Sequence, residues 1–371
     1  MKILFLTPWY PDEKRPNHGI FVRAQAVAVS SQHEVVVISS KVNYDKSAWG
    51  SYELTESSFE NVKEYRLVIN RSLPIYNQIN YFLISLRVAS TIARRFKPDV
   101  IHGNIGYPGG FWSWLVSRRI KRPFIITEHT FIYNNFRTFL HKKLTLFSLR
   151  KAAAIITVSK KAAKEMKNHV HRDARIIPNI VEVGGYSIAQ YPPAPIAIGF
   201  LGGLSSPHHV KGLDRLMEAL SKIKKNYVLH IGGAGVMMDG YQLLAHRLGI
   251  SAQCKFLGFV PVSKVPAFMN QLHFFVNTSR FESFGIAIVE AMASGLPVVC
   301  FDNGGPSDFV DQTNGLLVEN QDSVKLKAAI EWMMENYQTY HRERIRTAVA
   351  ERFSGETFVS RMNQIYQEVS Q

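Results

Sequence analysis

The chain has 371 residues, of which 46% are hydrophobic and 12% aromatic, so the composition predicts a globular protein and excludes a disordered one. Because this length exceeds one ordinary hydrophobic core, we expect two domains. The formal net charge is +15, and residues 1–185 carry all of it, with 28 Lys and Arg against 13 Asp and Glu. The first half therefore predicts an anionic partner, which could be a nucleic acid, an anionic membrane surface or a phosphorylated acceptor.

Short apolar runs alternate with helical patterns along the chain, which indicates βαβ units and parallel sheets. The expected strands of the first half are Ile3–Thr7, Val35–Ser39, Val100–His102, Phe124–Thr127 and Ile155–Val158. Residues 182–195 are rich in Gly and Pro and read as a linker. The expected strands of the second half are Ala197–Leu201, Tyr227–Ile231, Cys254–Phe256, Phe274–Asn277, Val298–Phe301 and Gly315–Val318. The sequence thus predicts an α/β fold with two doubly wound domains, residues 1–185 and 186–350, and a C-terminal helix over residues 351–371 that packs back towards the first domain.

The sequence lacks the motifs that are typical of several function classes. No run of 18 apolar residues indicates a membrane span, and Cys254 and Cys300 provide neither a disulfide framework nor a metal-binding spacing. The sequence has no Asp-x-Asp, His-Glu-x-x-His or Walker A pattern. We therefore expect a reduced, cytoplasmic protein without a metal site.

The most informative stretch follows the expected strand Phe274–Asn277. In open parallel sheets, ligands bind at the carboxyl ends of the strands. There the chain enters an apolar helix, which starts near Phe284, Gly285 and Ile286 and carries Glu290. Since a buried carboxylate needs a partner, Glu290 either has a structural partner or faces a polar ligand. Glu282 fits a simple helix N-terminal acid or, together with Glu290, a pair that binds the hydroxyls of a polyhydroxylated ligand.

Three further positions carry weaker signals. Lys211 stands at an expected helix start, where a cation is unfavourable unless an anion binds beside it; the alternative is a solvated surface lysine. His129 follows the strand Phe124–Thr127 and is either a structural histidine or a substrate contact. The glycines of segment 232–235 resemble a dinucleotide loop, which is weak evidence alone.

Taken in order, a set of motifs matches one family. The matching segments are Tyr10-Pro11 with 19–25, 98–102, 127–129, 177–179, 211–213, 256–260, and Glu282-Ser283-Phe284-Gly285 followed by Glu290. Over essentially its whole length the chain resembles the family 4 glycosyltransferases. These are retaining enzymes of the GT-B architecture, in which two Rossmann-like domains face a deep inter-domain cleft.

The resemblance implies a function and a set of site residues. It implies transfer of a sugar from a UDP- or GDP-linked donor to a glycan or lipid-linked acceptor, as in bacterial cell-surface polysaccharide or glycolipid synthesis, with no metal ion or cofactor. The catalytic residues implied are His129 beside the sugar and acceptor, Glu282 on the donor sugar and Lys211 on the diphosphate. The donor-binding residues implied are Lys211 and Glu282 again, with Gly19, Gly203, Gly233, Phe259, Val260, Ser283, Phe284, Gly285, Ile286, Ala287 and Glu290, the last on the ribose hydroxyls.

One departure from the family pattern concerns the phosphate site. The family usually has Arg where this chain has Gly203, and the candidates to replace it are His208 or His209 in the longer loop, or another Arg that reaches the site. If nothing replaced it, loss of one charge-assisted phosphate contact would weaken donor binding by about 1.5–3 kcal/mol.

Two alternatives to a glycosyltransferase stay open at this point. One is a non-catalytic or epimerase-type nucleotide-sugar-binding protein. The other, less favoured, is a basic nucleic-acid binder, for which no recognised module is visible. Cations and apolar residues alternate over residues 94–97, 118–122 and 137–151, which favours peripheral docking on an anionic membrane.

Overall fold

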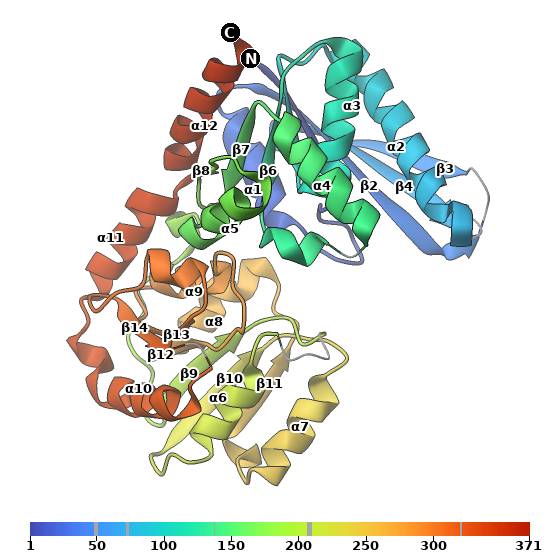
Figure 1. Ribbon diagram of the computed structural model, residues 1–371. Helices are drawn as coiled ribbons and strands as arrows, with labels where there is room; N and C mark the ends of the chain where they lie inside the picture. The colour runs from blue at the N-terminus through green and yellow to red at the C-terminus, as the bar shows by residue number, and fades with distance from the viewer. Residues whose placement is uncertain (48–50, 72–73, 137, 206–209, 320) are drawn as a thin grey trace. The chain divides into compact units, whose positions relative to one another are not determined.

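A computed structural model describes residues 1–47, 51–71, 74–136, 138–205, 210–319 and 321–371. The chain forms two compact units (Figure 1). The first consists of Met1–Ile180 and Gly355–Gln371, and the second of Val181–Ser354. The chain thus leaves the first unit after Ile180 and rejoins it at Gly355, whereas the limits expected from the sequence are residues 185 and 350.

The first unit is built on a sheet that has eight strands among the described residues, in the order β3-β4-β2-β1-β5-β6-β7-β8. The strands are β1 Lys2–Thr7, β2 Glu34–Ser47, β3 Tyr52–Phe59, β4 Val62–Arg71, β5 Val100–Asn104, β6 Phe124–Glu128, β7 Ala154–Thr157 and β8 Arg175–Ile176. β3 pairs antiparallel with β4, and the other neighbouring pairs are parallel.

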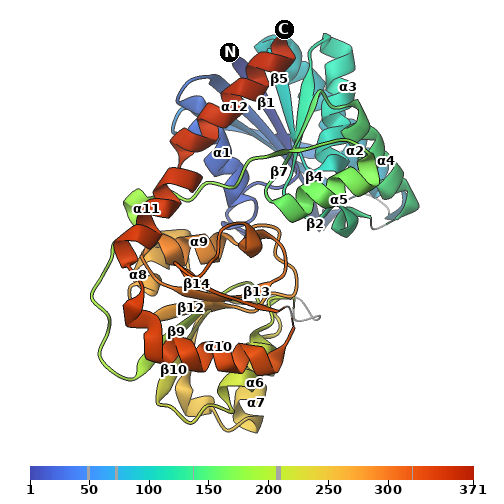
Figure 2. The same cartoon turned by 60° about the vertical axis from the view of Figure 1, so that its left-hand side comes forward.

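Helices cover both faces of this sheet (Figures 1 and 2). They are α1 Ile20–Ser30, α2 Pro74–Phe96, α3 Phe111–Ile120, α4 Phe139–Lys151, α5 Lys160–Val170 and α12 Gly355–Ser370. Because side chains alternate along a strand, Ile3 and Phe5 of β1 pack on α1 and α12, whereas Leu4 and Leu6 pack with residues of α2 and α3. The hydroxyl of Tyr366 in α12 lies 2.8 Å from Nδ1 of the buried His102, so α12 completes the core of the first unit.

The second unit is built on a parallel sheet that has six strands among the described residues, in the order β11-β10-β9-β12-β13-β14. The strands are β9 Ile196–Leu201, β10 Tyr227–Gly232, β11 Cys254–Gly258, β12 Phe274–Asn277, β13 Val298–Asp302 and β14 Gly315–Glu319. The helices are α6 Leu213–Leu220, α7 Met238–Arg247, α8 Val265–Met269, α9 Ile286–Ala293, α10 Ser323–Asn336 and α11 Arg342–Phe353.

Both units therefore have the doubly wound α/β fold that the sequence predicts. Every strand expected from the sequence is present, while β3, β4 and β8 were not predicted. In the described part of the chain, no helix is both long and apolar enough to cross a membrane.

Candidate active site

The segment between β12 and α9 has a backbone held by local contacts. Gly285 takes a left-handed conformation with φ of 100° and begins α9, which leaves the first amides of the helix without partners inside it. The backbone oxygen of Glu282 accepts a hydrogen bond from the Gly305 amide at 2.7 Å. Phe284 packs against Phe309 and Phe353 in the core. Since the Phe284 side chain is buried, only its backbone is available to a ligand.

Glu282 and Lys211 form an ion pair in the structure. Lys211 Nζ lies 2.8 Å from Oε2 of Glu282, and the same oxygen accepts a hydrogen bond from the Ser279 hydroxyl at 3.2 Å. Lys211 reaches Glu282 because Gly212, with φ of 69°, lets the chain turn tightly before α6. A Cβ at residue 212 would lie 1.9 Å from the carbonyl oxygen of Thr278. A lysine and an acid that are distant in sequence thus meet before the start of α9.

Glu290 has a structural partner that the sequence did not reveal. Tyr186 donates its hydroxyl to Oε1 of Glu290 at 3.0 Å. Burial raises the pKa of the Glu290 carboxyl to about 7, and the Tyr186 hydrogen bond lowers it in part. Tyr186 lies in the predicted linker, where no periodicity distinguished it. Glu290 is therefore a partly buried carboxyl group whose pKa lies well above its ordinary value, one turn into α9.

Three predicted positions lie at the carboxyl ends of β10 and β11. Gly233 has φ of 150°, and a Cβ there would lie 2.0 Å from the carbonyl oxygen of Gly202. Its amide donates to the Gly258 carbonyl at 2.7 Å, just before the exposed ring of Phe259 and the half-buried Val260. Glycine is thus required at residue 233 by a close approach of two strand ends.

The loop before Lys211 is only partly described. A Cβ at Gly203 would meet no atom within 4 Å, so the backbone does not require glycine there. His208 and His209, the candidates to replace the missing arginine, lie outside the described residues.

Two predicted residues lie together in the first unit. Gly19, with φ of 70°, begins α1, and a Cβ there would lie 2.4 Å from the backbone of Trp9. Phe21, in the first turn of that helix, packs on the ring of His129 with centroids 4.6 Å apart. His129 is buried, and its Nε2 lies 2.7 Å from Asn104 Oδ1. Burial lowers the pKa of His129 to about 3, so the imidazole is neutral at physiological pH.

With this geometry in place, comparisons with known proteins identify the family. The profile described as "Glycosyltransferase Family 4" matches residues 19–184. The profile described as "Glycosyl transferases group 1" matches residues 199–352. Together the two profiles cover most of the chain, one in each unit.

The chain is a family 4 glycosyltransferase. An uncharacterized glycosyltransferase of Methanocaldococcus jannaschii is 27% identical to it over 85% of this chain and 89% of the relative. A phosphatidyl-myo-inositol mannosyltransferase of Mycobacterium leprae is 28% identical over 84% of this chain and 85% of the relative. The structure of HepE from Anabaena in complex with UDP superposes with a TM-score of 0.77 at 20% identity, covering 99% of this chain and 100% of the other. This likeness agrees with the GT-B fold.

In this glycosyltransferase, most of the predicted residues of the second unit group around the start of α9, whereas Gly203, Gly233, Phe259 and Val260 follow β9, β10 and β11. Glu282, Ser283, Phe284, Gly285, Ile286, Ala287 and Glu290 lie on one segment, and Lys211 contacts it through Glu282. Ser279 and Tyr186, which contact the two carboxylates, were not predicted from the sequence. Among the described residues, no group of three or more His, Cys, Asp and Glu side chains is arranged to hold a metal ion.

Proposed function

We propose that this glycosyltransferase transfers a sugar from a UDP- or GDP-linked donor, with retention of configuration and without a metal ion or cofactor, to a glycan or lipid-linked acceptor. The observation that carries the proposal is the contact of Lys211 with Glu282 beside the start of α9, with Glu290 one turn into the same helix. A cation, helix amides and two carboxylates in one place match the diphosphate, sugar hydroxyls and ribose hydroxyls of such a donor.

The charge of the departing diphosphate is the main demand on this site. Lys211 and the first amides of α9 supply positive potential where that charge develops, and such preorganised electrostatics is usually the largest catalytic contribution. When the diphosphate binds, Lys211 can turn from Glu282 to the phosphate oxygens, and Glu282 then accepts hydrogen bonds from the donor sugar. This exchange of partners requires no divalent cation.

Retention follows if the acceptor hydroxyl attacks on the face from which the diphosphate leaves. The bond from the anomeric carbon to the diphosphate oxygen breaks, the bond to the acceptor oxygen forms, and the acceptor proton passes to the departing phosphate. No enzymic nucleophile is needed. Because burial keeps the pKa of His129 near 3, His129 is a weak base and contributes a hydrogen bond to the sugar or acceptor rather than proton abstraction.

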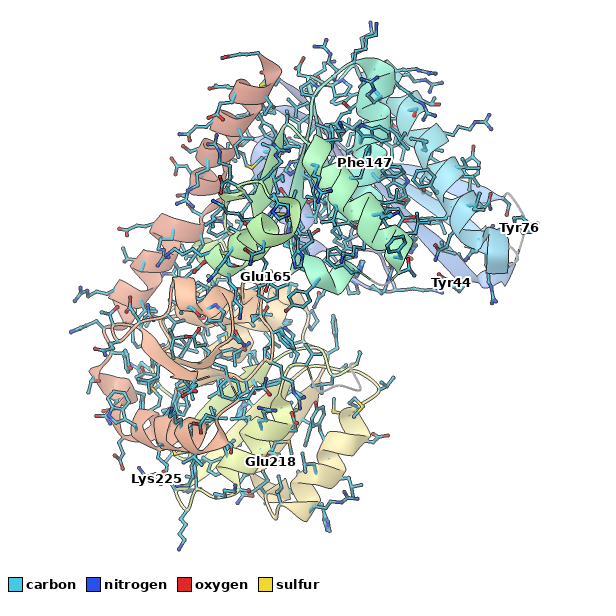
Figure 3. The ribbon with its side chains drawn as sticks, viewed as in Figure 1. Tyr44, Tyr76, Phe147, Glu165, Glu218 and Lys225 are labelled. Atoms are coloured by element: carbon cyan, nitrogen blue, oxygen red, sulfur yellow. The ribbon has the colours of Figure 1, made fainter. Side chains whose placement is uncertain are left out.

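The surface of the first unit supports an acceptor held at an anionic membrane. At the start of α4, Phe139 and Leu140 are 72% and 60% exposed, next to the exposed Lys142 and Lys143. Further apolar residues of α4 do not share this exposure: Leu144 and Leu146 are half-buried, and Phe147, which Figure 3 labels, packs on Trp114. The exposed apolar residues of α4 are therefore confined to its first turn, where Phe139 and Leu140 lie beside cations and favour anionic lipid. The name of the mycobacterial relative, a phosphatidyl-myo-inositol mannosyltransferase, agrees with a lipid acceptor.

The test is a donor screen on the full-length protein. Binding of UDP, GDP and a panel of their sugars is measured by calorimetry, and hydrolysis or transfer products are identified by mass spectrometry. We expect one nucleotide to bind, and its affinity to fall when Lys211 is replaced by Met. The matched control is Lys222→Met, an exposed lysine of the same unit. Failure of both nucleotides to bind would overturn the proposed donor class.

A further inference from the structure

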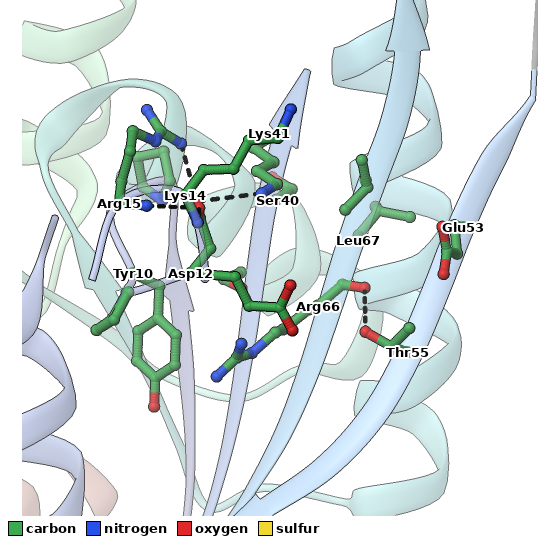
Figure 4. Close-up of a pocket in the computed structure, with 15 residues that line it drawn as sticks. Tyr10, Asp12, Lys14, Arg15, Ser40, Lys41, Glu53, Thr55, Arg66 and Leu67 are labelled. Atoms are coloured by element: carbon green, nitrogen blue, oxygen red, sulfur yellow. Dashed lines mark hydrogen bonds and ion pairs between the residues drawn. The ribbon is translucent and has the colours of Figure 1, made fainter. Parts of the chain in front are cut away.

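The first unit contains two adjoining cavities that the donor site does not use. The larger, of about 370 Å³, lies among residues that follow β1 and β5, the second half of β2 and the starts of α2 and α4. The smaller, of about 270 Å³, lies against β2, β3 and β4 (Figure 4). The two share Pro8, Arg15, Ser40 and Lys41. The larger cavity is in the range of small-molecule sites, which is roughly 300–1,000 Å³.

The larger cavity is lined by aromatic and neutral polar groups. Four aromatic side chains line it, namely Trp9, Tyr44, Tyr81 and Tyr107, and so do His18, Asn77, Gln78 and His141. The rings of Tyr107 and His141 stack with centroids 4.8 Å apart. Aromatic faces pack on the C–H faces of a sugar ring, while amides and imidazoles hydrogen-bond its hydroxyls. The described lining includes no Asp or Glu, so this cavity favours a saccharide and offers no repulsion to an anion.

Two cations, Arg15 and Lys41, lie where the two cavities adjoin. They line both cavities and form ion pairs with the same carboxylate. Oδ2 of Asp12 lies 3.2 Å from a guanidinium nitrogen of Arg15 and 3.1 Å from Nζ of Lys41. One acid between two cations leaves an excess positive charge for a further anion.

The described lining of the smaller cavity has four cations, Lys14, Arg15, Lys41 and Arg66, against three acids, Asp12, Glu13 and Glu53, so a small positive excess remains. There Arg66 lies 2.7 Å from Glu64, which Arg23 also binds at 2.8 Å. The Nε of Arg66 is buried and has no hydrogen-bond partner among the described residues. A buried donor without a partner is costly, so a ligand oxygen that reached it would be stabilised.

From these observations we infer that the first unit binds an acceptor saccharide that carries a phosphate or carboxylate. Its ring occupies the larger cavity, and its anionic group lies at Arg15 and Lys41, with Arg66 in the adjoining smaller cavity. This inference rests on the proposed function, since it assigns the chemical class of the acceptor.

Exposed apolar side chains adjoin lining residues of the larger cavity along α2 and α4, which fits a lipid-linked form of such a saccharide. Tyr76 and Ile79, which flank the lining residues Asn77 and Gln78 in α2, are 47% and 55% exposed. The exposed Leu140 precedes the lining residue His141 in α4. Tyr44, in the lining, and Tyr76 lie at the same end of the unit (Figure 3). Exposed apolar side chains beside a polar, cationic cavity suit a ligand with a charged head and an apolar tail.

The experiment compares anionic and uncharged saccharides on the full-length protein. Glucose 1-phosphate, galactose 1-phosphate, glucuronic acid and galacturonic acid are titrated by calorimetry against methyl glucoside and methyl galactoside. A hexose linked to polyprenyl diphosphate in detergent micelles gives the lipid-linked arm. We expect an anionic saccharide to bind at least ten-fold more tightly than its uncharged counterpart, with an affinity that falls as salt is added. Tighter binding of the lipid-linked hexose than of all soluble ones identifies a lipid source, and the reverse identifies a soluble acceptor.

Variants locate the binding. Arg15→Gln and Lys41→Gln should each weaken binding of the anionic saccharide about ten-fold, whereas Arg15→Lys should retain most of it. Arg118→Gln, an exposed arginine of α3, is the matched control, and melting temperatures verify that each variant is folded. Equal binding of anionic and uncharged saccharides, or equal affinities for Arg15→Gln and Arg118→Gln, would overturn the inference.

UDP, titrated on the same samples, separates this inference from the proposed donor. The UDP affinity should be unchanged in all of these variants. Saccharide binding that depends on Arg15, in a protein that binds neither UDP nor GDP, would keep the cavity assignment and overturn the donor class instead.

Discussion

Replacing Glu290 by Gln tests both its burial and its role in the donor site. The structure raises the pKa of this carboxyl from its ordinary value near 4.5 to about 7. A raised carboxyl pKa means that the folded state binds the proton more tightly than the unfolded state. Stability should therefore fall as the pH rises from about 4.5 to about 7, and the whole cost should be present above pH 7. The difference between the two pKa values corresponds to about 3 kcal/mol in the free energy of unfolding.

Glu290→Gln removes this cost, since the amide is neutral and its oxygen can still accept the Tyr186 hydrogen bond. In urea denaturation at pH 8, we expect the variant to be more stable than the parent by up to about 3 kcal/mol, and at pH 5 this difference should shrink to about 1 kcal/mol or less. The same substitution weakens the hydrogen bonds of the ribose hydroxyls. The affinity for UDP or GDP should therefore fall about ten- to one hundred-fold in calorimetry.

Tyr186→Phe provides the control for this pair of effects. It keeps the carboxylate and removes its structural donor, so nucleotide binding should persist while stability above pH 7 falls. If Glu290→Gln gave the same stability change at pH 5 and pH 8, the argument from burial would be wrong. If it left nucleotide affinity unchanged, the ribose role would be wrong.

Three further predictions concern the rest of the molecule. Transfer should continue in EDTA, because Lys211 and the α9 amides carry the phosphate charge, and loss of activity that added Mg²⁺ restores would contradict this. In liposome sedimentation, the bound fraction should rise with anionic lipid and fall with salt. It should also drop when Lys142, Lys143 and Arg150 are changed to Glu, because each cation contributes about 1 kcal/mol to binding. The control is the same change at Lys222 and Lys224, and equal recovery on neutral and anionic liposomes would refute docking. Gly212→Ala should lower the free energy of unfolding by about 1–3 kcal/mol, because a Cβ there would lie 1.9 Å from the Thr278 carbonyl oxygen. Gly203→Ala, where a Cβ would meet no atom within 4 Å, should change it by less than about 0.5 kcal/mol. Similar values for the two variants in urea denaturation would refute the steric argument.

The sequence predicted the parallel strands because they are buried and apolar on both faces. β12, for example, has all four of its residues buried. The hairpin of β3 and β4 escaped prediction for the opposite reason. All eight residues of β3 are exposed, and β4 carries the buried Glu64 among its apolar positions, so neither strand shows a clean alternation.

The candidate site was predictable where its residues are close in sequence, and not where they meet through the fold. Glu282 and Glu290 share one segment, and their spacing was readable. Lys211 and Glu282 are 71 residues apart, and Tyr186 and Glu290 are 104 apart. Such contacts depend on the strand order of the sheet, which periodicity does not encode. The pKa of Glu290 depends first on its burial in the folded unit and then on the hydrogen bond from Tyr186, so it could not be predicted either.

The return of α12 to the first unit has a consequence for synthesis on the ribosome. Residues 1–180 emerge early, but Phe358, Met362 and Tyr366, which complete their core, are made only after the whole second unit. At about 5–20 residues per second, this delay is roughly ten seconds or longer. During that time the apolar side of α1 and the imidazole of His102 lack their covering helix. The nascent first unit is therefore a natural client for chaperones, and an N-terminal fragment expressed alone should aggregate unless residues 355–371 are supplied as a peptide.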